Sequence, residues 1–200
     1  MWELSLSLPF GQPAPSSRGS QYQSIDIPKK PGYTIPRKVG MGMNLAWCSL
    51  ENQTGHEAGR ALLADLYRRE TGEALPEIRL TDRGKPCFPD RAYHFSISHT
   101  KRHAFCVLSE KNIGIDAEEL DRKVNLSLGD KILSPEEKRQ FDAAADKQKA
   151  LLTFWVLKEA AAKLSGEGLR GYPSHTNFSL DDPRVMEIDG CLVAVLTEGA

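Results

Sequence analysis

Two helical segments separated by strand patterns limit the fold that this chain can adopt. Residues 55–71 carry apolar side chains at helical spacing. They follow a capping box formed by Thr54 and Glu57 and end before a glycine. A longer helix is expected over 147–165, again ended by a glycine. Because strands occur in runs with helices inserted between them, the order of elements predicts an α+β fold.

The expected strands are short and closely spaced. In the first run they are residues 95–100, 103–108 and 112–116. A hairpin on the Asp189-Gly190 turn is expected over 185–196. Ser134, followed by proline and by a glutamate at capping-box spacing, predicts the start of a further helix. Residues 9–40 hold six prolines, so extended loop and edge-strand structure is expected there.

The charge and hydropathy of the chain argue against several classes of function. With 26 Lys+Arg against 27 Asp+Glu, the net charge is −1, so binding to nucleic acid through a basic surface is not expected. No apolar run approaches the roughly 20 residues of a membrane helix, and the first ten residues lack the basic residue of a secretory signal. A cytoplasmic protein without a membrane partner is expected. The four cysteines are spaced too widely for a CxxC pair and are expected to be small apolar residues or free thiols.

Two carboxylates in the segment Gly114 to Glu118 form the first candidate site. On a strand, Asp116 and Glu118 project from the same face because side chains alternate. Two crowded carboxylates repel unless a cation lies between them, and oxygen ligands at this spacing suit Mg²⁺. The alternative is a solvated strand end.

Three charged residues on the second helix form the next candidate. Glu159 and Lys163 have the spacing of an ordinary surface ion pair, which is the alternative interpretation. However, the helix is apolar around them and should bury much of its circumference. We therefore expect Lys158, Glu159 and Lys163 to face a site.

Ser98, His99 and Lys85 are the donors expected to hold phosphate oxygens. A Ser-His nucleophile pair is the rival interpretation. Adjacent strand residues point to opposite faces, so His99 is poorly placed to activate Ser98, and no G-x-S-x-G elbow occurs. A serine hydrolase is therefore not favoured.

Five motifs, taken in order, resemble those of the 4'-phosphopantetheinyl transferases, most closely the surfactin-synthetase-activating type. They span about residues 80–170 and are Arg83-Gly84-Lys85-Pro86, Phe95 to Thr100, Gly114 to Glu118, Leu133 to Glu137, and Phe154 to Lys163. The resemblance implies an α+β fold of two similar subdomains about a pseudo-twofold axis. We expect an N-terminal subdomain over 1–98, with the irregular proline-rich start and one core helix, and a C-terminal subdomain over 99–200 with the metal motifs.

The resemblance also implies a reaction. The family transfers 4'-phosphopantetheine from coenzyme A to a serine of an apo acyl or peptidyl carrier protein, with Mg²⁺, and releases 3',5'-ADP. Asp116, Glu118 and Glu159 would be the Mg²⁺ ligands, and Glu159 or a metal-bound water would act as general base. The residues implied to bind coenzyme A are Lys85, Ser98, His99, Lys158 and Lys163.

The first 50 residues match the family poorly. Lys29, Lys30 and Arg37 are candidates for the 3'-phosphate by charge alone. Local basic surface for an acidic carrier is expected there or at Lys101 and Arg102. A fused pseudo-dimer is expected to be a monomer. Two other functions stay open: a family member that binds coenzyme A or carrier without catalysis, and a metal-dependent phosphohydrolase acting on a nucleotide diphosphate.

Overall fold

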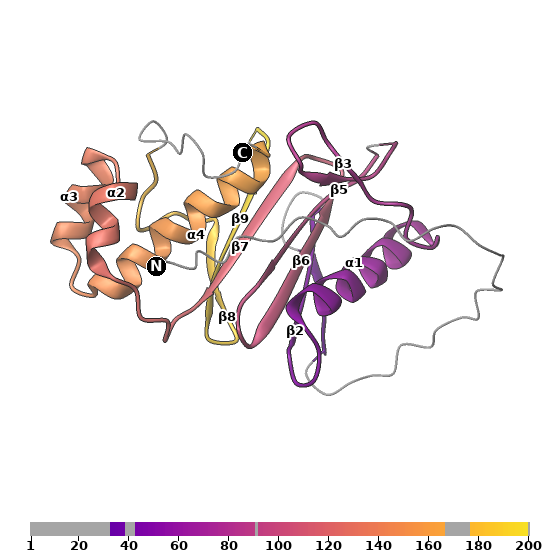
Figure 1. The fold of residues 1–200 in the computed structure, drawn as a ribbon, viewed down its shortest axis with the longest axis horizontal. Helices are drawn as coiled ribbons and strands as arrows, with labels where there is room; N and C mark the ends of the chain where they lie inside the picture. The colour runs from indigo at the N-terminus through magenta and orange to yellow at the C-terminus, as the bar shows by residue number, and fades with distance from the viewer. Residues whose placement is uncertain (1–32, 39–42, 91, 167–176, 200) are drawn as a thin grey trace. The chain divides into compact units, whose positions relative to one another are not determined.

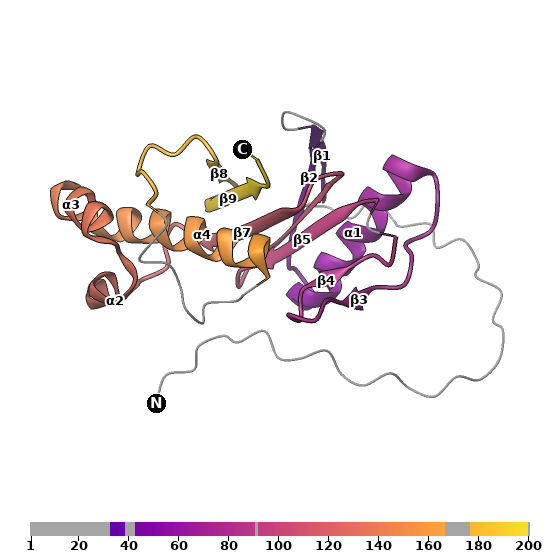
Figure 2. The same cartoon turned by 90° about the horizontal axis from the view of Figure 1, so that it is seen from above.

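The computed structural model describes residues 33–38, 43–90, 92–166 and 177–199. Two antiparallel sheets, each packed against one long helix, form most of this part (Figures 1 and 2). The first sheet has the order β1-β2-β6-β5, with bounds Tyr33–Lys38, Met43–Ser49, His103–Ser109 and His94–His99. The second has the order β7-β9-β8, with bounds Ile113–Glu119, Cys191–Thr197 and Val185–Ile188. A small ribbon pairs β3 (Arg79–Leu80) with β4 (Pro86–Cys87).

Helix α1 (Gly55–Thr71) covers the first sheet. Its start is the predicted capping box, because the Thr54 hydroxyl accepts from the Glu57 amide while the Glu57 carboxylate accepts from the Thr54 amide. Gly72 ends the helix with a φ of 78°, a conformation that favours glycine. The leucines on its inner face pack against β6, β2 and β5. Figure 1 shows the helix lying beside β2 and β6.

Helix α4 (Lys147–Ser165) lies along β7 and β9 of the second sheet (Figure 1). Asp146 caps its first turn, and Gly166, with a φ of 74°, ends it as predicted. The short elements η1 (Leu126–Leu128), α2 (Gly129–Ile132) and α3 (Pro135–Ala143) lie near its N-terminal half. The predicted Ser134 capping box opens α3.

A shared apolar layer holds the two sheets together. Leu45, Trp47, Phe105 and Val107 of the first sheet pack against the buried apolar residues of β7 and β9. The Trp47 indole also donates a 2.5 Å hydrogen bond to the Asp189 carboxylate in the predicted β8–β9 turn. The described part therefore has three apolar layers: α1 on its sheet, sheet on sheet, and α4 on its sheet.

The α+β class predicted from the order of elements is confirmed. The predicted boundary after residue 98 falls at the end of β5, which pairs with β6, so the first sheet continues to Ser109.

The predicted irregular stretch lies outside the described residues up to position 32, and Lys29 and Lys30 lie outside them as well. Among the described helices, none has the length and hydropathy required to cross a membrane.

Candidate active site

The candidate site forms where an edge strand of each sheet meets the other. Over the described residues, β5 pairs only with β6 and β7 only with β9, so no backbone ladder joins β5 to β7. Side chains connect them instead: the Ser96 hydroxyl accepts from the Ile115 amide at 3.1 Å, and the Ser98 hydroxyl accepts from the Ala117 amide at 3.2 Å. Both contacts join residues 19 positions apart, so the two strands run parallel here.

Gly114 explains how α4 comes close enough to contribute to the site. A Cβ at this position would overlap the carbonyl oxygen of Ala160 and lie 2.6 Å from the backbone nitrogen of Leu164. Only glycine lets the helix backbone approach β7 this closely. The motif glycine therefore brings Glu159 and Lys163 over the strand that carries Asp116.

Asp116 is the central residue of the group. It is 6% exposed, and its Oδ1 accepts from the Ser98 hydroxyl at 2.9 Å and from the Lys163 ammonium at 2.8 Å. Lys163 also reaches the Ile97 carbonyl of β5 at 3.4 Å, so its ammonium spans the joint between the sheets. The structure thus brings together three predicted site residues: Ser98, Asp116 and Lys163.

Glu118 and Glu159 belong to the same group electrostatically. Burial raises the pKa of Glu118, and Asp116 adds to this, while Arg122, its ion-pair partner, opposes it. Burial, followed by the charge of Asp116, raises the pKa of Glu159 to about 7, and Lys163 lowers it only in part. A carboxyl that titrates near neutral pH is suited to accept a proton.

The carboxylates of Asp116, Glu118 and Glu159 are of the ligand type that divalent cations prefer. Mg²⁺ prefers oxygen ligands and usually takes one or two carboxylates, with substrate phosphates and water completing its shell. Within the described ranges, no group of three His, Cys, Asp or Glu side chains is arranged to hold a metal ion by itself. The donors therefore suit a cation that is completed by substrate oxygens, and they do not form a closed protein site.

Lys158 does not join this group. Consecutive helical residues differ by about 100°, which turns Lys158 away from Glu159 and into the core. There its ammonium pairs with Glu137 at 2.7 Å, and the two side chains are 2% and 0% exposed. Glu137 also accepts from the amides of Ser134 and Phe178, so the ion pair ties α3, α4 and the segment after residue 176 together.

Lys85 also makes contacts of a structural kind. Its ammonium donates to the Asn112 side chain at 2.5 Å, to the Ile113 carbonyl at 3.2 Å and to the Leu164 carbonyl at 2.9 Å. Burial lowers the pKa of Lys85 to about 8. With three protein acceptors, the ammonium connects the β3–β4 ribbon to β7 and to the last turn of α4.

His99 is exposed and lies at the edge of the group. Its ring covers Gly55 at the start of α1, where a Cβ would lie 2.5 Å from the ring. Partial burial, followed by the charge of Lys163, lowers the pKa of His99. Of the predicted phosphate donors, His99 and Lys163 are therefore the two that combine exposure with proximity to the carboxylates.

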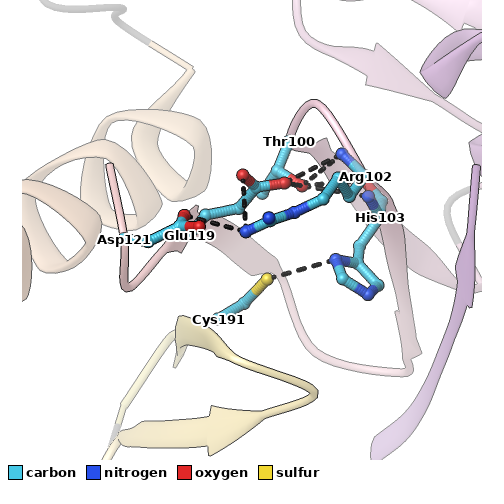
Figure 3. Close-up of polar contacts among 6 residues, drawn as sticks. All are labelled: Thr100, Arg102, His103, Glu119, Asp121 and Cys191. Atoms are coloured by element: carbon cyan, nitrogen blue, oxygen red, sulfur yellow. Dashed lines mark hydrogen bonds and ion pairs between the residues drawn. The ribbon is translucent and has the colours of Figure 1, made fainter. Parts of the chain in front are cut away.

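The turn after His99 is fastened to the end of β7 by a network that motif reasoning missed (Figure 3). The Glu119 carboxylate accepts from the Thr100 hydroxyl and the Arg102 amide, each at 2.9 Å. The Arg102 guanidinium pairs with Glu119 at 3.0 Å and with Asp121 at 2.8 Å. Both Arg102 and its neighbour Lys101 are exposed, but among the described residues only Arg102 is held by carboxylates of the chain.

Comparisons with known proteins agree with the resemblance inferred from the motifs. The family model described as the 4'-phosphopantetheinyl transferase superfamily matches residues 112–191, which include β7, α4 and most of the site. The chain is 30% identical over 129 residues to a protein of Nostoc sp. strain PCC 7120 named 4'-phosphopantetheinyl transferase HetI, covering 60% of this chain and 54% of that protein.

Two further relatives bear related names. A 4'-phosphopantetheinyl transferase of Bacillus subtilis is 33% identical over 86 residues, or 42% of this chain and 37% of that protein. The 4'-phosphopantetheinyl transferase gsp of Aneurinibacillus migulanus is 28% identical over 122 residues, or 56% of this chain and 51% of that protein. The matches thus span about half or less of these relatives, and the predicted resemblance to the superfamily is confirmed.

Proposed function

We propose that this chain, whose residues 112–191 match the 4'-phosphopantetheinyl transferase superfamily, transfers 4'-phosphopantetheine from coenzyme A to a serine of an apo carrier protein. The observation that carries the proposal is the meeting of three carboxylates with one ammonium at the joint of two sheets. Asp116 and Lys163 are in direct contact, and Asp116 acts on the pKa of both Glu118 and Glu159.

The chemistry requires charge neutralisation and one proton acceptor. The carrier serine oxygen attacks the β-phosphorus of coenzyme A, the bond to the α-phosphate oxygen breaks, and 3',5'-ADP leaves. Lys163, which is 31% exposed and already spans the joint, is placed to stabilise the diphosphate charge. Glu159, whose pKa is about 7 when no cation is bound, is the proposed acceptor of the serine proton when it does not coordinate Mg²⁺.

Asp116, Glu118 and Glu159 are the residues that would hold Mg²⁺. When bound, the cation supplies charge neutralisation at the diphosphate. Arg122 pairs with Glu118, and Lys163 pairs with Asp116. Two side-chain cations therefore offset the negative charge of these carboxylates. This arrangement supports an ion that enters with the substrate phosphates.

The contacts of the remaining predicted residues support different roles. His99 is proposed to contact a coenzyme A phosphate, because it is exposed beside Lys163. The contacts of Lys85 and Lys158 favour a structural role, since each ammonium is engaged with protein acceptors. We also propose that two similar halves meet at residues 110–112, because each half is one long helix on an antiparallel sheet.

Mass spectrometry of an apo carrier protein tests the proposal. The protein is incubated with coenzyme A, Mg²⁺ and the carrier, and the carrier should gain one phosphopantetheine on its serine. A phosphohydrolase would cleave coenzyme A and leave the carrier mass unchanged, whereas a non-catalytic binding protein would alter neither. Glu159→Gln provides the matched inactive variant, with an expected loss of about 10²–10⁴-fold.

A further inference from the structure

A row of three hydroxyls on β5 and its following turn faces β7. Ser96, Ser98 and Thr100 occupy alternate positions, so they share one side of the chain. They contact positions 115, 117 and 119 of β7, always 19 residues further along. The row takes the place of a backbone ladder and sets the register of β5 against β7.

Ser98 differs from the other two members of the row. Its oxygen accepts from the Ala117 amide, as the Ser96 oxygen does from Ile115, but its proton is also donated to Asp116 Oδ1 at 2.9 Å. A hydroxyl has one proton to donate. Because that proton is engaged and Ser98 is 5% exposed, no donor is left for a phosphate oxygen.

The hydrogen bonds to Asp116 reach only one of its two carboxylate oxygens. Both hydrogen bonds that this carboxylate makes with described residues, from Ser98 and from Lys163, reach Oδ1. Oδ2 accepts no hydrogen bond from a described residue and is left for a ligand, and the Ser98 hydroxyl, together with Lys163, fixes which oxygen that is. Hydrogen bonds of this kind orient carboxylate ligands in metal sites.

We infer that Ser98 is a positioning residue that orients the Asp116 carboxylate, and that it does not bind a phosphate of coenzyme A. The inference rests on the proposed function, because it concerns the carboxylate that would receive the divalent cation. According to this inference, cation binding depends on a residue of β5 as well as on the carboxylates of β7 and α4.

Ser98→Ala and Ser96→Ala form a matched pair for the test. Each removes one hydroxyl that accepts from a β7 amide, but only Ser98→Ala releases Asp116. The readout is the affinity for Mn²⁺ with equimolar coenzyme A, from the electron paramagnetic resonance of free Mn²⁺, with coenzyme A alone as the blank. The Michaelis constant for coenzyme A is measured beside it.

Ser98→Ala should weaken Mn²⁺ binding by about 10–100-fold and leave the Michaelis constant for coenzyme A within about threefold at saturating metal. Ser96→Ala should change neither, and Ser98→Thr, which keeps the hydroxyl, should bind Mn²⁺ like the wild type. If Ser98→Ala does not fold, Ser98→Cys, with its weak donor, should show the same direction of change.

Two results would overturn the inference. The first is unchanged Mn²⁺ affinity in Ser98→Ala or Ser98→Cys together with a tenfold or larger rise in the Michaelis constant for coenzyme A. That result would return Ser98 to the phosphate site and leave the proposed transfer reaction intact. The second is a wild type that neither binds Mn²⁺ with coenzyme A nor modifies a carrier, which would remove the proposed function and this inference together.

Discussion

Replacing Glu159 by glutamine should stabilise the protein at alkaline pH when divalent cations are absent. Burial and the charge of Asp116 raise the pKa of Glu159 from an ordinary value of 4.5 to about 7. The folded protein therefore keeps a proton that the unfolded chain has already released between these two pH values. Its stability falls as the pH rises through this window, and the full penalty is present above pH 7.

The size of the effect follows from the two pKa values. The difference between 4.5 and about 7 corresponds to at most about 3 kcal/mol of unfolding free energy. Because Glu159 is only partly buried, solvent screening reduces this value, and we expect Glu159→Gln to gain about 1–2 kcal/mol at pH 8. Below pH 4.5 the glutamate is protonated in both states, so the gain should vanish.

Urea denaturation in EDTA at pH 4.5, 6, 7 and 8 measures this gain. Glu110→Gln, at an exposed position in the turn between β6 and β7, is the control and should show no comparable rise. Adding Mg²⁺ together with coenzyme A at pH 8 should reduce the advantage of Glu159→Gln, since a cation bound with the substrate phosphates would stabilise the wild type. A Glu159→Gln variant that is less stable than the wild type at pH 8, or equally stable at all four pH values, would refute the reasoning.

Outcomes are expected for four further variants. Gly114→Ala should lower the unfolding free energy by about 1–3 kcal/mol in urea and abolish carrier modification, because its Cβ meets the α4 backbone; an unaffected variant would contradict the close approach. Lys158→Met should cost about 3–5 kcal/mol by leaving Glu137 buried without its cation, and adding Glu137→Gln should recover part of that loss in the same assay. Arg102→Glu places a third carboxylate beside Glu119 and Asp121 and so disturbs the end of β7. The rates of modification of the carrier and of a short peptide acceptor should therefore fall by the same factor. Lys101→Glu should slow the carrier alone, and a carrier-specific defect in Arg102→Glu would instead assign that residue to docking.

Local signals in the sequence were sufficient for most elements of the fold. The capping boxes at Thr54 and Ser134, the glycines after α1 and α4, and the Asp189-Gly190 turn all act within a few residues, and each lies where it was predicted. The joint between β5 and β7 was not predicted, because its contacts join residues 19 positions apart. The alternating hydroxyls of Ser96, Ser98 and Thr100 are the signal from which it could have been found.

The candidate site was predicted in part. Asp116 with Glu118, and Glu159 with Lys163, follow from strand alternation and helix spacing, and the structure brings them into one group. The exposure of a lysine does not follow from such patterns. Lys85 and Lys158 have the residue type of a phosphate ligand, but their ammonium groups are engaged by carbonyls and by Glu137. Whether a charge meets solvent or a buried partner depends on distant segments of the chain.

The connection between β5 and β7 has a consequence for how such a protein evolves. A backbone ladder is indifferent to most substitutions, because every residue except proline supplies the same amide and carbonyl groups. A joint built from side-chain hydroxyls can be changed by a single mutation, because replacing Ser98 removes its contact with Asp116 while both sheets keep their internal pairing. Mutation can thus change the position of Asp116 relative to Ser98 of the first sheet without changing the stability of either sheet. A substitution at Ser98 can therefore change how Asp116 is held without changing the backbone pairing of either sheet.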